Sequence, residues 1–200
     1  MNDPRRMDQV RKLICDEAAR IMAEEDVQDF QHAKRKASTR LALGPSHGWP
    51  SNLEVEQALS ERLRLFSGAE RICRLERMRW IVLDAMGLLS NYHPRVVGSV
   101  VSGNVTANTP VELHAFADTV EEVALFIEEH GIPVRPFDKR FRFGGDRCKE
   151  VPGLRLTADD VQVVVFVFGP VGLRESPLAP VDGKPMRRLR RDEFQQITWD

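Results

Sequence analysis

The chain has 200 residues, of which 42% are hydrophobic and 30% charged, and its formal net charge is -1. This composition is typical of a globular protein, and the near-neutral charge argues against a protein whose whole surface binds a polyanion. The start of the chain is polar and no run reaches the roughly 18 apolar residues of a membrane helix, so we expect a cytoplasmic protein without a secretory signal or a membrane span.

The first part of the chain is predicted to be helical. Asp3-Pro4 opens an amphipathic helix that ends near Glu25, and a second helix is expected from about Val27 to Leu43. The polar side of this second helix carries a basic cluster, which is either a solvated helix face or a contact for RNA phosphates or an acidic protein: Lys34, Arg35, Lys36 and Arg40. Gly44-Pro45 and Gly48-Trp49-Pro50 then form a loop.

Two capping-box patterns mark the next helices. Ser51 with Glu54 opens a helix through about Phe66, and Ser67 with Glu70 opens another from about Ala69 to Leu89. His93-Pro94 stops the latter helix. We take residues 1–68 as a helical N-terminal region.

From Arg95 the periodicity changes to that of strands. Short apolar runs predict strands at Val96–Val101, Val111–Phe116, Val134–Phe143, Val151–Leu156 and Val161–Phe168, with a helix from Thr119 to about Glu129. The last run is almost wholly apolar, which predicts a central strand covered on both faces. The fold class is therefore α/β (α+β), with a mixed sheet of about five strands in residues 69–170. Residues 171–200 form a C-terminal extension that ends in a helical turn or two near Asp192–Ile197.

One stretch of this second part carries a specific pattern. Gly98-Ser99 follows a strand, Gly103 comes next, and the triplet Val111-Glu112-Leu113 opens the following strand. This order and spacing, with the long helix before it, resemble the polymerase-beta-like nucleotidyltransferases over about Arg77–Phe168. In that family the Gly-Ser turn holds a nucleoside triphosphate and an Asp-x-Asp pair on the next strand holds magnesium.

The resemblance assigns roles to individual residues. It implies that Gly98, Ser99 and Gly103 bind phosphate and that Glu112 is a ligand of Mg²⁺, with Glu112 and His114 as the catalytic candidates. Positions i and i+2 of a strand share a face, so Pro110, Glu112 and His114 are the three residues at the place of the acids. One of these three is a carboxylate, and the apolar Val161–Phe168 run offers no third acid beside it. Proline has no metal-binding side chain, and histidine prefers softer ions than magnesium.

Basic residues favour phosphate binding over metal binding. Arg135, Lys139, Arg140 and Arg142 follow on one predicted strand, with Arg140 and Arg142 on the face opposite Lys139. Arg140 and Arg142 are candidates for phosphate binding, and the alternative is an exposed charged strand. A dense basic run in the C-terminal extension is either a flexible solubilising tail or a contact for a protein or RNA partner: Arg187, Arg188, Arg190 and Arg191. The three cysteines, Cys15, Cys73 and Cys148, fit neither a disulfide framework nor a zinc site.

Three functions remain open from the sequence. The first is a nucleotidyltransferase-like protein that binds a nucleotide or phosphate and has weakened or lost activity. The second is an active enzyme that moves a nucleoside monophosphate from a nucleoside triphosphate to a protein, RNA or small molecule. The third is an α+β interaction domain without enzymatic activity. The missing acids favour the first.

Overall fold

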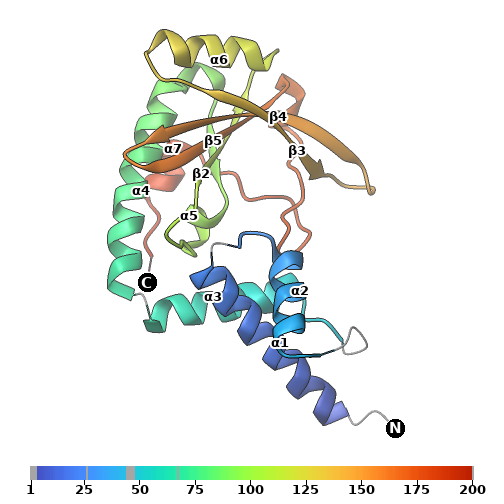
Figure 1. Cartoon of the computed structure of the whole chain (residues 1–200). Coiled ribbons are helices and arrows are strands. Elements are labelled where there is room, and N and C mark those ends of the chain that lie inside the picture. The colour runs from blue at the N-terminus through green and yellow to red at the C-terminus, as the bar shows by residue number, and fades with distance from the viewer. Residues whose placement is uncertain (1–3, 26, 44–47, 67, 200) are drawn as a thin grey trace. The chain divides into compact units, whose positions relative to one another are not determined.

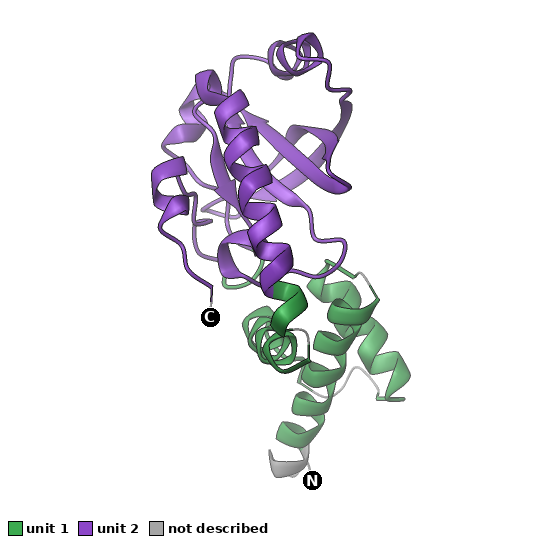
Figure 2. Ribbon diagram, turned by 90° about the vertical axis from the view of Figure 1, so that its left-hand side faces the viewer, with its two compact units in different colours: residues 1–71, 180–182 green, residues 72–179, 183–200 purple. Residues whose placement is uncertain are grey.

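The computed structural model describes residues 4–25, 27–43, 48–66 and 68–199, with side chains from residue 7 onward. Of the boundary signals named above, Asp3, Gly44-Pro45 and Ser67 lie outside the described residues. The chain forms two compact units, one of residues 1–71 and 180–182 and one of residues 72–179 and 183–200 (Figure 2). The C-terminal extension therefore contributes to both units.

The N-terminal unit is helical. It contains α1 (Pro4–Glu24), α2 (Phe30–Arg40) and α3 (Asn52–Phe66), and α1 packs against both of the other helices (Figure 1). The apolar side chains at helical spacing in the sequence form its core, which includes Val10, Ile14, Ala18, Ile21, Phe30, Ala33, Val55, Leu59 and Leu63. The predicted capping box at α3 is present, because the Ser51 N–H donates to the Glu54 carboxylate (2.7 Å) and the Glu54 N–H donates to Ser51 Oγ (3.2 Å).

Helix α2 is shorter than the predicted Val27–Leu43. The Asp29 side chain accepts a hydrogen bond from the His32 N–H (2.6 Å), so the helix begins after Asp29 rather than at Val27. It ends at Arg40, and Ala42 beyond it has a left-handed backbone (φ 51°). A good N-cap thus sets the start of the helix although the residues before it are compatible with helix.

The basic cluster of α2 is largely used inside the N-terminal unit. Lys34 is buried, and its Nζ donates to the Pro50 carbonyl (3.1 Å) and to Asn52 Oδ1 (2.7 Å). Lys36 and Arg40 both form ion pairs with Glu25. The prediction of an exposed basic face was wrong for Lys34, because its ammonium group binds the Pro50 carbonyl and the side chain of Asn52 at the start of α3.

The C-terminal unit holds a mixed five-stranded sheet, which confirms the predicted α+β class. The helices are α4 (Gly68–Leu88), α5 (Ser99–Ser102), α6 (Val120–Glu129) and α7 (Arg191–Gln195), with single 3₁₀ turns η1 (Ser90–Tyr92) and η2 (Pro170–Leu173). The strands are β1 (Arg95–Val97), β2 (Val111–Phe116), β3 (Arg135–Arg142), β4 (Cys148–Ala158) and β5 (Val161–Phe168). Their order is β1-β2-β5-β4-β3, in which β2 and β5 are parallel and the other neighbours antiparallel.

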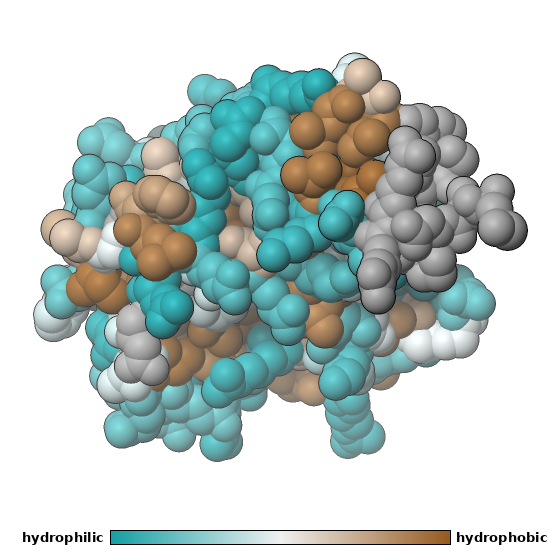
Figure 3. Space-filling view, turned by 90° about the horizontal axis from the view of Figure 1, so that it is seen from below, coloured by the Kyte–Doolittle hydropathy of each residue, from teal (hydrophilic) through white to brown (hydrophobic). Residues whose placement is uncertain are grey.

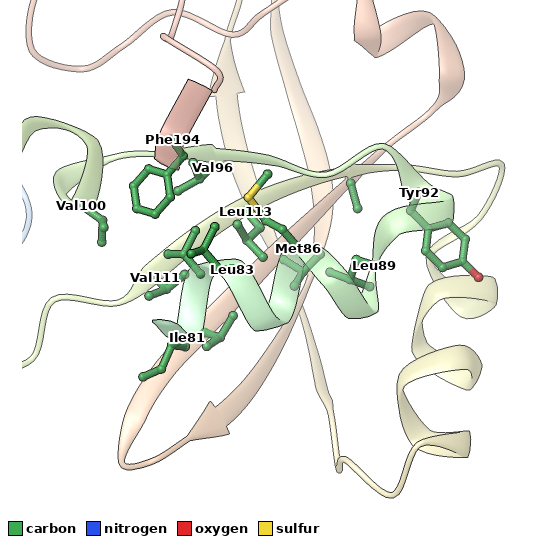
Figure 4. Close-up of a cluster of buried hydrophobic side chains, with 14 of the residues drawn as sticks. Ile81, Leu83, Met86, Leu89, Tyr92, Val96, Val100, Val111, Leu113 and Phe194 are labelled. Carbon is green, nitrogen blue, oxygen red and sulfur yellow. The ribbon is translucent and has the colours of Figure 1, made fainter. Parts of the chain in front are cut away.

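Strand β5 lies at the centre of the sheet and is covered on both faces, as its composition predicts. Val163, Val165 and Val167 point into a core with α4 and α6, whereas Val164, Phe166 and Phe168 belong to a second cluster on the other face. Figure 4 shows the first core, in which the side chains of α4 meet those of β1, β2 and α7. The sheet face that carries Val164, Phe166 and Phe168, opposite the core with α4 and α6, holds the functional candidates and is called the open face below.

The predicted strand Val96–Val101 was wrong beyond Val97. Gly98 adopts φ 77°, and the chain turns into the four-residue helix α5, which Gly103 ends with φ 81°. A glycine is needed at each point because other residues rarely adopt a positive φ. The run of valines is therefore split between a strand and a helical turn that both bury apolar side chains.

The C-terminal segment is docked rather than free within its unit. The backbones of Val96 and Leu189 exchange two hydrogen bonds of 3.0 Å, and Phe194 of α7 is fully buried.

No helix in the described part of the chain has the length and apolarity to cross a bilayer. In the face drawn in Figure 3, apolar clusters are separated by hydrophilic side chains.

Candidate functional site

The open face of the sheet carries a pocket with mixed polar and aromatic walls. The pocket has a volume of about 300 Å³ and is open to solvent. It is lined by Pro110, Glu112, Phe137, Asp138, Lys139, Arg155, Gln162, Val164 and Phe166. These residues come from the end of the loop before β2 and from the four strands β2 to β5, so one rigid sheet positions most of the site.

The Gly-Ser turn lies next to this pocket through Glu112. Strand β1, which ends at Val97, pairs antiparallel with β2, and Val97 stands opposite Glu112 in the ladder. A Cβ on Gly98 would come within 2.5 Å of Glu112 Oε2, so the carboxylate occupies space that glycine leaves open. Ser99 is half-buried at the start of α5, and neither Gly98 nor Ser99 is among the lining residues.

Glu112 is engaged by a cation of the same chain. Lys139 Nζ lies 3.1 Å from Glu112 Oε1 and forms an ion pair with it. The same ammonium group lies 4.8 Å from the centre of the Phe166 ring and 5.3 Å from that of Phe141. An ammonium over an aromatic face is attracted by the ring, so Lys139 is held between the carboxylate and the aromatic cluster.

His114 is sealed in the open face and is not a solvent-exposed base. Its side chain is fully buried, with the Phe141, Phe166 and Phe168 rings at centroid distances of 4.6 to 6.0 Å. Arg188 Nε donates to His114 Nδ1 (2.9 Å). Burial, followed by the positive charges of Arg188 and Lys139, lowers the pKa of His114 well below its ordinary 6.5, so the ring is neutral.

The residues at the place of the family's acids do not fit a magnesium ion. Mg²⁺ takes oxygen ligands in octahedral geometry, usually with carboxylates. Pro110 offers no ligand, Glu112 pairs with Lys139, and His114 already accepts from Arg188. On β5 the residue opposite Glu112 is Val164. In the part of the chain that the structure describes, no three His, Cys, Asp or Glu side chains cluster as a metal site.

The carboxylates closest in sequence to the missing third acid lie elsewhere. Asp159 and Asp160 form the tight turn between β4 and β5, where both have a positive φ. Arg77 of α4 donates to the Asp159 carbonyl. A two-residue hairpin with left-handed positions explains why two aspartates stand there, since Asp tolerates that conformation.

The basic residues of β3 are divided between the two faces of the strand. Lys139 lines the pocket, whereas neither Arg140 nor Arg142 does. Alternation places both arginines on the opposite face of β3, and Arg142 lies 3.8 Å from Asp146. The structure therefore brings Lys139, rather than Arg140 or Arg142, to Glu112.

Most of the pocket lining was missed from the sequence, including two polar residues, Arg155 and Gln162. Arg155 of β4 stacks with its guanidinium carbon 4.1 Å from the centre of the Phe137 ring. Gln162 of β5 adds an amide to the wall. The available signal was that Gly153 and Arg155 are two residues apart on one predicted strand and so share a face, on which glycine makes room for a large neighbour. The pairing of this strand with the one that carries Phe137 is not visible in the sequence.

The basic run of the C-terminal extension is mostly engaged within the unit. Arg188 donates through Nη1 to the Gly172 carbonyl (2.6 Å) and lies over the Phe168 ring (4.9 Å). Arg191 donates to the Leu83 carbonyl (2.8 Å), and Arg190 pairs with Glu193. The alternative of a flexible tail was wrong for these residues, because the aromatic cluster and backbone carbonyls hold them.

Comparison of the sequence with models of known protein families gave no match, and comparison with curated proteins gave none.

Proposed function

We propose that the chain is a nucleotidyltransferase-like protein that binds a nucleotide in the open-face pocket without transferring its nucleoside monophosphate. The observation that carries the proposal is the pocket itself, which is lined by Lys139, Arg155 and aromatic side chains and by Glu112, the residue that also borders Gly98. The resemblance in sequence order supplies the class of ligand.

The chemistry of the wall suits a nucleotide. Phe166 and Val164 form the buried apolar bottom of the pocket, and Gln162 offers both a donor and an acceptor for the edge of a base. Lys139 and Arg155 offer positive charge for phosphate oxygens. An apolar floor with a few polar groups around it is the usual composition of a small-molecule site.

The same wall argues against transfer. Nucleotidyl transfer builds negative charge on phosphate oxygens, and two-metal enzymes stabilise it with ions held by carboxylates. Here Glu112 stands without a second acid at positions 110, 114 or 164, and its carboxylate is already paired. Binding is therefore proposed to survive in a site whose metal ligands are missing.

Titration calorimetry on the full chain tests the proposal. The four nucleoside triphosphates and the four monophosphates are titrated into the wild type and into Ser99→Ala, Lys139→Gln and Glu112→Gln. We expect micromolar or weaker binding of at least one nucleotide, a clear loss in Lys139→Gln, and a larger loss in Ser99→Ala than in Glu112→Gln.

The exposed Arg140, on the other face of β3, provides the control, and Arg140→Gln is expected to bind like the wild type. If no nucleotide binds at millimolar concentration, or if all variants bind equally tightly, the proposal fails.

A further inference from the structure

We infer that the pocket holds its nucleotide through a single dianionic phosphate group without a metal ion, bound by Arg155 of the lining and by Arg135, an exposed residue that lies opposite Arg155 in the ladder and outside the lining. The preferred ligand is then a nucleoside monophosphate rather than a magnesium-bound triphosphate. This inference rests on the proposed function and specifies the class of ligand.

Two arginines face each other on the open face with no carboxylate between them. Arg135 of β3 and Arg155 of β4 are directly opposite in the antiparallel ladder, so their side chains leave the sheet on the same face. Like charges in this position repel each other and destabilise the strand pair. Neither arginine forms an ion pair with any carboxylate of the described residues. A bound dianion removes this repulsion.

The Arg155 side chain is already held in a binding orientation. Its guanidinium lies over the Phe137 ring, 4.1 Å from the ring centre. Phe137 can take this place because it lies against Gly153, where a Cβ would come within 2.7 Å of two Phe137 ring atoms. Stacking on a ring face leaves the N–H groups in the guanidinium plane free, and that fork matches the oxygens of a phosphate.

The remaining charges of the pocket match one phosphate better than three. The Lys139 ammonium is shared with Glu112, and Asp138 adds a second carboxylate to the wall. With the Lys139–Glu112 pair neutral, Asp138 offsets one of the two arginines and leaves a net charge of +1, which a phosphate monoester exceeds by less than a triphosphate does. A triphosphate carries about twice the charge of a phosphate monoester and normally brings Mg²⁺, for which the residues beside Glu112 are unsuited.

The volume agrees with a small ligand. At about 300 Å³ the pocket lies at the lower end of the range of small-molecule sites.

Calorimetry with full-length protein distinguishes the ligand classes. Four sets of ligands are compared, namely nucleoside monophosphates, the matching nucleosides, inorganic phosphate, and triphosphates, each with magnesium and with excess EDTA. We expect one or more monophosphates to bind with an affinity that EDTA does not change, and the matching nucleoside and inorganic phosphate each to bind at least about ten-fold more weakly. We expect Arg155→Gln and Arg135→Gln to weaken the monophosphate by roughly 10- to 100-fold, the usual effect of losing a hydrogen bond to a charged group.

Controls separate a lost contact from a lost fold. Arg140→Gln removes a neighbouring charge from the opposite face of β3 and should leave the affinity unchanged, and thermal melts should show that all three variants fold. Triphosphate binding that is tighter than monophosphate binding and disappears with EDTA would overturn the inference and leave the proposed function standing. Wild-type affinity in both Arg135→Gln and Arg155→Gln would also overturn it. Absence of binding by every nucleotide would overturn both.

Discussion

Removal of the Arg188 side chain is predicted to destabilise the C-terminal unit by about 2 kcal/mol. Arg188 reaches from the C-terminal segment to the open face and donates three hydrogen bonds, to His114 Nδ1 (2.9 Å) and to the carbonyls of Gly172 (2.6 Å) and Glu175 (3.2 Å). Its guanidinium also lies over the Phe116 and Phe168 rings. One side chain thus joins η2, β2, β5 and the C-terminal segment.

The magnitude follows from what the Arg188→Ala variant leaves behind. His114 Nδ1 stays fully buried without a donor, which costs about 1–3 kcal/mol, and each carbonyl loses a bond with a net worth of about 1 kcal/mol. Against this, the variant no longer buries a guanidinium. Burial, with a smaller effect of Arg95, lowers the pKa of Arg188 to about 10, which shows that the charge is poorly solvated in the folded state. The free energy lost with the three hydrogen bonds exceeds the free energy gained by no longer burying the guanidinium, and we expect a net destabilisation of about 2 kcal/mol.

Denaturant unfolding followed by circular dichroism measures the total effect, and hydrogen exchange locates it. The amides of Val96 and Leu189, which bond to each other's carbonyls, should lose protection in Arg188→Ala because they tie the same segment to β1. Arg187→Ala removes the exposed neighbouring arginine and should stay within about 0.5 kcal/mol of the wild type. Equal stability of Arg188→Ala and Arg187→Ala, with protected Val96 and Leu189 amides, would refute the reasoning.

Three further predictions concern the same face of the sheet. Because His114 stays neutral in the folded state, it takes up a proton only in the unfolded chain as the pH falls below about 6.5. The free energy of unfolding should therefore drop by up to about 1.4 kcal/mol per pH unit, well before the carboxylates protonate. Urea unfolding at several pH values measures this slope, and the same slope in His114→Gln would contradict the prediction. Gly153→Ala should push Phe137 out from under Arg155 and weaken nucleotide binding while costing about 1–3 kcal/mol of stability, as calorimetry and thermal melts can show; wild-type affinity would disprove the stacked arrangement. With labelled nucleoside triphosphates, magnesium or manganese and a cell extract as the source of acceptors, the chain should show little or no nucleotidyl transfer, and Pro110→Asp should not restore it, because each metal ion contributes several kcal/mol to the transition state. Robust transfer that disappears in Glu112→Ala would instead establish an enzyme.

The sequence predicted the elements well where local signals determine them. The Ser51–Glu54 capping box, the Thr119 cap of α6 and the apolar β5 run each place an element to within a residue or two, because each signal acts within one turn or strand. The errors fell where a single residue changes the backbone. Gly98 turns a run of valines from strand into helix, and whether a glycine adopts a positive φ depends on what surrounds it.

The site was less predictable because strand order and register assemble it. Glu112 and Lys139 are 27 residues apart on strands that are not neighbours, and the aromatic rings under the Lys139 ammonium help to hold it at the carboxylate. Arg188 lies 74 residues from His114, in a stretch whose composition suggested a free tail. A basic run reads the same in sequence whether its arginines face solvent or buried aromatic rings, so burial is the information that the sequence lacks.

Two of the three residues at the place of the resembling family's acids are each faced by a cation of this chain. Glu112 receives the Lys139 ammonium and His114 receives the Arg188 guanidinium, whereas Pro110 stands where the family pattern has its first acid. A side-chain cation differs from Mg²⁺ because it cannot act as a Lewis acid that coordinates the attacking oxygen and the phosphate oxygens at one centre. Lys139 and Arg188 are also fixed, one by Phe166 and the other by backbone carbonyls, so their charge stabilises the resting sheet. Such an arrangement supports a preformed binding surface, and it leaves the negative charge of a transfer reaction without the metal ions that would stabilise it.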